Sequence, residues 1–185
     1  MHLLSRKHIN VLRLFYDVLD VVILFCYLKH LHSMYGPYSN TVRLFAPVHI
    51  GDINLLESVQ RRFTKRLSGM CGLSYLQRLQ RIGMETLELR RLKTDLIMMF
   101  KFLNNVVDID FSNFFSLSKV TNTRGHRFKL NKPLSRVNAR LFSFSCRRID
   151  CWNSLPDNLI NSESIALFKS RLITVNLSKH LIVFF

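Results

Sequence analysis

One amphipathic stretch, residues 52–67 (DINLLESVQRRFTKRL), constrains the fold of this chain more than any other feature. Its apolar residues recur at the i, i+3, i+7, i+11 spacing with which a helix packs one side against a core. They are Leu56, Val59, Phe63 and Leu67. Asp52 is placed to cap the first turn, and Gly69 is placed to end the helix in a left-handed conformation. The sequence therefore predicts a helix over 52–67 with these four apolar residues facing inward.

The other side of the same helix is cationic. The residues concerned are Arg61, Arg62, Lys65 and Arg66. Two like-charge pairs at i,i+4 disfavour an isolated helix by a few tenths of a kcal/mol each, and only Glu57 is placed to offset Arg61. Such a face indicates a polyanionic partner, and the alternative is a basic face that is merely solvated.

The composition favours the first interpretation. The 185 residues carry a net charge of +15, from 27 Lys and Arg against 12 Asp and Glu. A charge of that sign steers a chain toward nucleic acid or anionic lipid. A hydrophobic fraction of 48% argues against overall disorder, and the low counts of 6 Gly and 4 Pro favour helices over a turn-rich sandwich.

The cysteines and paired acids do not form a recognisable metal site. Neither CxxC nor zinc-finger spacing occurs among Cys26, Cys71, Cys146 and Cys151, so we expect reduced thiols, no zinc and a nuclear or cytoplasmic protein. Asp108 and Asp110 lack a third ligand at a recognisable spacing. We expect them to cap a loop.

Residues 1–50 differ from the remainder. An apolar stretch over 11–31 suggests a helix, followed by a connector over 33–47. A membrane span needs about 20 mostly apolar residues, but only 21–28 is uninterrupted, and the charged residues at 13, 17 and 20 would each cost about 2.5–3.5 kcal/mol near a bilayer centre. We expect a buried or aberrant helix, with membrane anchoring as the alternative.

Further helices are predicted downstream. Their ranges are 74–82, 86–103, 137–152 and 164–172. Ser74 and Gln77 have the form of a capping box, and Arg78 is expected on the outer face of its helix. Pro156 forbids continuation of the third helix, and Trp152 is expected to anchor the core.

A long region over 111–149 contains no acidic residue. Within it the apolar or aromatic side chains at 126, 128 and 130 alternate with Arg127 and Lys129. This period of two predicts a short strand, hairpin or extended arm. A basic arm with an interleaved aromatic suits phosphate contacts and base stacking, and the alternative is an exposed, solvated hairpin.

Five segments in this order resemble a known family: LLESVQRRFTKRL (55–67), LSYLQRLQRIGMETLELRRLKTDLIMMFKFL (73–103), RGHRFKL (124–130), CWNSLP (151–156) and SIALFKSRL (164–172). The series is similar to the C-terminal part of the polymerase of jockey-like non-LTR retrotransposons, over about residues 51–179. The resemblance implies a mainly α, thumb-like domain over 51–105, followed by a basic arm and C-terminal helices over 106–179. An apolar tail over 180–185 lies beyond the match.

The family's parent is an RNA-directed DNA polymerase that uses Mg²⁺. Together with the charge pattern, the resemblance implies contacts to RNA or an RNA–DNA duplex, and a polymerase palm as a further partner. The implied contact residues are Arg61, Arg62, Lys65, Arg66, Arg90, Arg91, Arg124, Arg127 and Lys129.

The chain departs from the family at the point that matters for catalysis. Reverse transcriptases hold two metal ions on a palm Asp-Asp and a further Asp, and no Asp-Asp occurs in this sequence. We therefore expect a truncated fragment that is no enzyme on its own, needs no cofactor and at most binds nucleic acid. The alternatives are polymerase activity with a palm supplied in trans, a membrane-associated basic protein anchored by 11–31, and a non-functional relic.

Overall fold

The computed structural model describes residues 50–183, except 108–109, 119–124, 135, 137 and 142. These residues belong to one compact unit, Phe45–Phe185. The unit is mainly α, as predicted: the described residues form helices, with no strand among them, and Leu117 forms an isolated antiparallel bridge with Leu130. The predicted helix over 11–31 and the connector over 33–47 lie outside the described residues.

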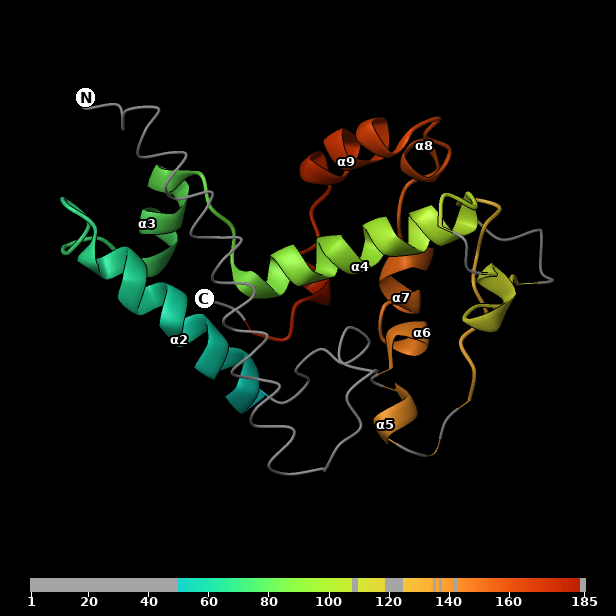
Figure 1. Cartoon of the computed structure of the whole chain (residues 1–185), viewed down its shortest axis with the longest axis horizontal. Helices are drawn as coiled ribbons and strands as arrows, with labels where there is room; N and C mark the ends of the chain where they lie inside the picture. The colour runs from blue at the N-terminus through green and yellow to red at the C-terminus, as the bar shows by residue number, and fades with distance from the viewer. Residues whose placement is uncertain are drawn as a thin grey trace. The chain divides into compact units, whose positions relative to one another are not determined.

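Three helices form close to their predicted ranges, although the first begins before its predicted cap Asp52, which lies inside its first turn. They are α2 (Ile50–Arg66), α3 (Tyr75–Ile82) and α4 (Leu87–Leu103). Ser74 and Gln77 form the predicted capping box, and Gly83 ends α3 with a φ of 68° that a side chain would oppose. Thr86 caps α4 by accepting the Leu89 amide. Helix α4 contacts both α2 and α9 (Ile165–Thr174), and Figure 1 shows this arrangement.

The core lies along α4. Leu92, Leu96 and Met99 of this helix are fully buried, and the ring of Phe100 stacks on that of Phe168 with centroids 4.2 Å apart. Trp152 is 1% exposed and anchors the core, as predicted. The Met and Phe residues of α4 are therefore packing residues.

The predicted inward face of α2 is wrong in part. Leu56 is buried, but Val59 is 42% exposed, and Phe63 and Leu67 are only half-buried. The buried face instead carries polar side chains at 57, 60 and 64 beside Ile53 and Leu56. The physical reason is that α2 packs on the start of α4 and on α3, where main-chain and side-chain polar groups need partners.

Arg78 of α3 is a further polar side chain that is buried at the interface with α2. It was expected outside, yet it is buried, because its guanidinium donates to the Thr64 hydroxyl at 3.2 Å and to the Leu73 carbonyl at 2.6 Å. A periodicity argument counts apolar side chains, and it therefore misses an interface built from polar ones.

The single helix predicted over 137–152 is also wrong. The described residues form α5 (Asn138–Leu141), α6 (Phe144–Arg147) and α7 (Ile149–Asn153) instead. The Ser143 hydroxyl donates to the Arg140 carbonyl, which gives the chain an alternative to a continuous helix. Arg148 then forms the boundary between α6 and α7 at a φ of −116°.

The C-terminal helices follow Pro156. A short helix, α8 (Asp157–Ile160), was not predicted, while α9 begins within its predicted range, after the cap Ser164. Phe168 and Leu172 of α9 are buried. A 3₁₀ turn over Ser178–His180 leads into the tail.

Candidate nucleic-acid interface

Three buried carboxylates each fix another segment against α4. They are Glu57, Glu88 and Asp95. Glu57 is fully buried and accepts the Leu87 amide with both oxygens, at 3.2 and 3.1 Å, together with the Tyr75 hydroxyl. A carboxylate at the first residue of a helix satisfies an otherwise unpaired amide and suits the positive end of the helix dipole. Glu57 therefore joins α2, α3 and α4.

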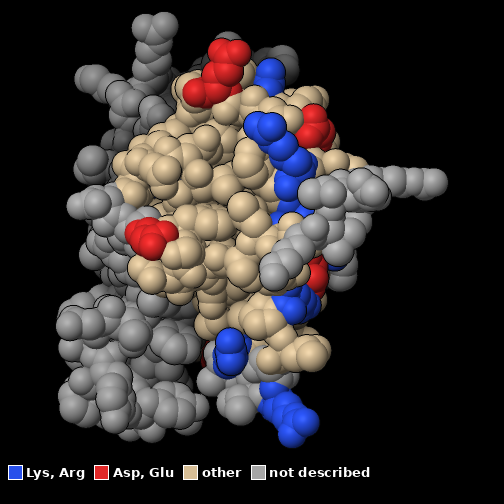
Figure 2. Space-filling view, turned by 90° about the vertical axis from the view of Figure 1, so that its right-hand side faces the viewer, with Lys and Arg blue, Asp and Glu red and all other residues tan. Residues whose placement is uncertain are grey.

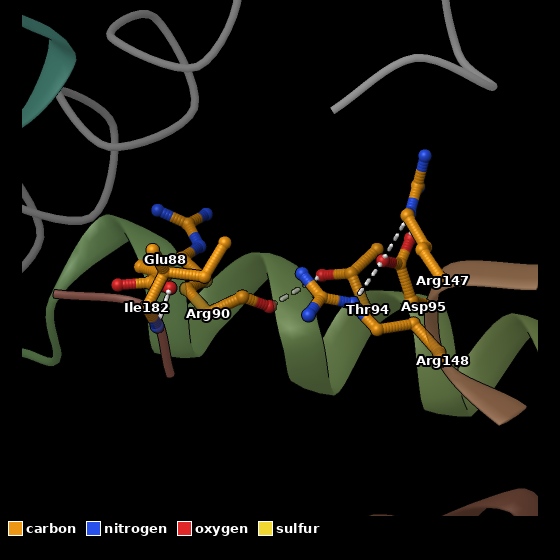
Figure 3. Close-up of polar contacts among 7 residues, drawn as sticks. All are labelled: Glu88, Arg90, Thr94, Asp95, Arg147, Arg148 and Ile182. Carbon is orange, nitrogen blue, oxygen red and sulfur yellow. Dashed lines mark hydrogen bonds and ion pairs between the residues drawn. The ribbon is translucent and has the colours of Figure 1, made fainter. Parts of the chain in front are cut away.

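Asp95 holds the boundary between α6 and α7. Arg147 donates to it with Nε at 3.0 Å and Nη2 at 2.8 Å, and Arg148 donates with Nε at 3.0 Å. Figure 3 shows both guanidinium groups directed toward this one carboxylate. All three side chains are nearly buried, so this ion triad is an internal structure and is not available to a ligand.

Glu88 holds the tail. Its two carboxylate oxygens accept the main-chain amides of Ile182 at 2.6 Å and Val183 at 3.2 Å. Figure 3 places this contact beside the start of α4, on the side from which Asp95 also projects. The apolar tail is thus tied down by its backbone at these two residues.

Several basic side chains are exposed and are not paired with the buried carboxylates. Arg62, Lys65 and Arg66 of α2 are exposed and make no ion pair within the described part of the chain. Their nearest acid in sequence, Glu57, points to the opposite, buried side of α2. The last two turns of α2 therefore present uncompensated positive charge.

The other predicted contact residues are less uniform. Arg61 is half-buried with its guanidinium 5.1 Å from the Tyr75 ring centroid, and Arg90 and Arg91 on α4 are half-buried too. Arg124 lies outside the described residues. Only some of the predicted contact residues are therefore fully exposed to solvent.

The arm residues pack on α7. Arg127 is exposed and lies over the Phe128 ring at 4.8 Å, whereas the Lys129 ammonium donates to the Asn153 carbonyl. Leu130 exchanges two hydrogen bonds with the Asn153 side chain, at 2.8 and 2.9 Å. Residues 125–130 and 151–156 are separate in sequence, and this pairing joins them.

Figure 2 shows one face of the molecule on which the Lys and Arg side chains lie in a narrow column. Asp and Glu side chains also lie on this face, some of them beside the column, and much of the other visible described surface carries no charge.

Sequence reasoning missed the three buried carboxylates. A signal was present, because Glu88 and Asp95 are seven residues apart and lie next to buried positions of the α4 stripe. Asp110 was predicted to cap a loop, and it does so by accepting the amide and hydroxyl of Ser112 at 2.9 and 2.7 Å. Cys71, Cys146 and Cys151 are free thiols.

Within the described ranges, no three His, Cys, Asp or Glu side chains are grouped so that they could hold a metal ion. The helices of those ranges are also too short or too polar to cross a membrane. No protein-family model, curated protein or solved structure matches the chain. The fold and charges define its class as a basic, mainly helical unit.

Burial raises the pKa of Glu57 above 4.5, against the opposing hydrogen bonds from Tyr75 and Leu87 and the charges of Arg91 and Arg61. The folded protein therefore binds this proton more tightly than the unfolded chain does. The stabilising contribution of Glu57 is complete below pH 4.5 and is lost as the pH rises through its folded pKa. We expect the stability advantage of the wild type over Glu57→Gln to shrink as the pH rises from about 4 to about 8.

Urea unfolding of both proteins, followed by circular dichroism across that range, measures this difference. Asp110→Asn is the control, because the pKa of the exposed Asp110 is lowered from 3.8 by its Ser112 bonds and its effect lies below the range. A stability difference between the wild type and Glu57→Gln that stays constant with pH would contradict the raised pKa of Glu57.

Proposed function

We propose that this chain is a catalytically incomplete, C-terminal part of a non-LTR retrotransposon reverse transcriptase that binds RNA or an RNA–DNA duplex through phosphate contacts. The order of the five sequence segments supports the family. The observation that carries the binding is the exposed, uncompensated charge of Arg62, Lys65 and Arg66 at the end of α2.

The charge distribution gives the proposal its mechanism. Phosphate contacts release counterions, so affinity falls linearly with the logarithm of salt concentration. Buried carboxylates such as Glu57 and Asp95 cannot repel the bound strand through solvent, because each is enclosed by its donors. Contacts of this kind fix position and carry little sequence information.

Catalysis is not part of the proposal. The sequence has no Asp-Asp with which a palm would hold two metal ions. A polymerase palm is a partner that would supply those carboxylates, and the chain alone would grip the duplex without extending a primer.

The test is a titration of the full chain with a fluorescent RNA–DNA duplex at several salt concentrations. The triple variant Arg62→Gln, Lys65→Gln, Arg66→Gln should bind more weakly, with a salt slope smaller by about 2–3, since each lost phosphate contact contributes about 0.7–0.9. Arg61 is left unchanged because it contacts Tyr75 and its loss could disturb α3.

A matched variant removes the same charge elsewhere. This control variant combines Arg140→Gln, Lys169→Gln and Lys179→Gln. The three replaced residues are also exposed, but they lie on α5, α9 and the 3₁₀ turn. We expect it to retain most of the slope. Equal losses in both variants would mean that net charge alone drives binding, and an unchanged slope in the first would remove α2 from the interface.

A further inference from the structure

The segment 125–130 is held against the C-terminal end of α7 by a compact set of hydrogen bonds. The Trp152 indole donates to the Phe128 carbonyl at 3.0 Å, and the Asn153 side chain pairs with the backbone of Leu130. His126 contributes the first contact of the set, to the carbonyl of Trp152. These bonds and the burial of Leu130 fix the position of the segment.

His126 is buried, and its hydrogen bond selects one tautomer of the neutral ring. Its side chain is 1% exposed, and Nε2 lies 3.0 Å from the Trp152 carbonyl oxygen. Because a carbonyl only accepts, Nε2 must carry the proton, and Nδ1 is left as an acceptor in the neutral ring. Nδ1 is buried and has no hydrogen-bond partner among the residues that the structure describes.

Protonation of His126 would add a second N–H to the buried ring, at Nδ1. The new Nδ1–H would point at no acceptor, and a buried, unsatisfied charged donor is costly. The charged groups that act on the ring are Lys129 of its own segment, which opposes protonation, and Asp157 of α8, which favours it. Burial is the largest influence and lowers the pKa of His126 below 6.5.

We propose that His126 is a pH-sensitive contact that holds segment 125–130 on α7 when it is neutral and releases the segment when it is protonated. Release would expose the imidazolium and free the Lys129 ammonium from the Asn153 carbonyl. The segment would then present more positive charge to solvent in acid. Release of the segment in acid does not require the chain to bind nucleic acid.

Proton linkage gives the direction in which the opening constant of the segment changes with pH. The open segment binds the proton with the ordinary pKa of 6.5, whereas the docked one binds it more weakly. The opening constant should therefore be independent of pH above 6.5 and rise about tenfold for each pH unit below it, until the docked ring itself protonates.

Hydrogen exchange of the Leu130 amide in the full chain measures this constant, because that amide donates to the Asn153 side chain and is freed on release. Rates are corrected for the intrinsic pH dependence of exchange. The Phe168 amide, bonded to the Ser164 carbonyl in α9, is the internal reference and should show no such rise. Trp152 is the only tryptophan, so its emission should shift to the red over the same range.

His126→Gln keeps a side-chain N–H donor but does not titrate, and it should abolish the rise at Leu130. The control His180→Gln removes the other described histidine whose pKa is lowered by burial, and it should retain the rise. Should His126→Gln not fold, NMR titration of the wild-type His126 ring replaces it, and the proposal requires the Nε2–H tautomer and protonation coincident with loss of Leu130 protection.

Three results would overturn the proposal. The first is a Leu130 opening constant that does not change with pH in the wild type. The second is the same rise in folded His126→Gln. The third is a parallel rise at Phe168, which would mean that acid unfolds the whole unit and does not release the segment.

Discussion

Asp95→Ala is expected to lower the free energy of unfolding by about 3–5 kcal/mol, because it leaves two nearly buried guanidinium groups without their shared carboxylate. The two oxygens of Asp95 accept three hydrogen bonds from Arg147 and Arg148. Those arginines lie at the boundary between α6 and α7, so their release would also loosen the short helices on which Trp152 depends. Urea unfolding followed by circular dichroism gives the magnitude.

The matched control is Asp150→Ala. Asp150 forms an ion pair with Lys132, but both side chains are well exposed, and such pairs contribute about 0–1 kcal/mol. Equal effects at positions 95 and 150 would show that the Asp95 triad is solvated and has no special structural role.

Trp152→Ala is expected to cost about 3–5 kcal/mol, the range for truncating a buried aromatic side chain. The indole packs near the Phe168 ring, with centroids 6.4 Å apart, and donates its N–H to the Phe128 carbonyl. The substitution therefore removes core volume and one of the bonds that hold segment 125–130. The same unfolding assay measures the loss.

Two further variants separate the contribution of core volume from that of the indole hydrogen bond. Trp152→Phe keeps most of the ring volume and loses the N–H donor, so it should cost less than the alanine change and should mainly increase exchange at Leu130. Ile173→Ala on α9 is 68% exposed and should change stability by at most about 0.5 kcal/mol. A Trp152→Ala effect as small as that of Ile173→Ala would contradict the central position of the indole.

The elements that could be predicted are those whose information is local. Ser74 with Gln77, Thr86 and Ser164 each cap a helix by bonds to residues within three positions, and Gly83 needs only its own left-handed φ. The apolar stripe of α4 is also local, because one side of a regular helix repeats every three or four residues. These features place α3, α4 and α9 without any knowledge of their neighbours.

The candidate site was predicted less well. Charge identified the basic end of α2, but the exposure of Arg62 and the stacking of Arg61 on Tyr75 depend on which side of α2 is buried. That side is chosen by Glu57, whose partners at 75 and 87 come from two other helices. A helical wheel that ranks residues by hydropathy places such a glutamate outside.

The sequence by itself determined a mainly helical unit, its capped helices, its core tryptophan and its excess of positive charge. Only the tertiary structure decided where carboxylates such as Glu57 and Asp95 go and how segment 125–130 docks on α7. The physical reason is that a buried charge is tolerated only where several donors from distant segments converge on it, and that convergence exists only after the helices have packed.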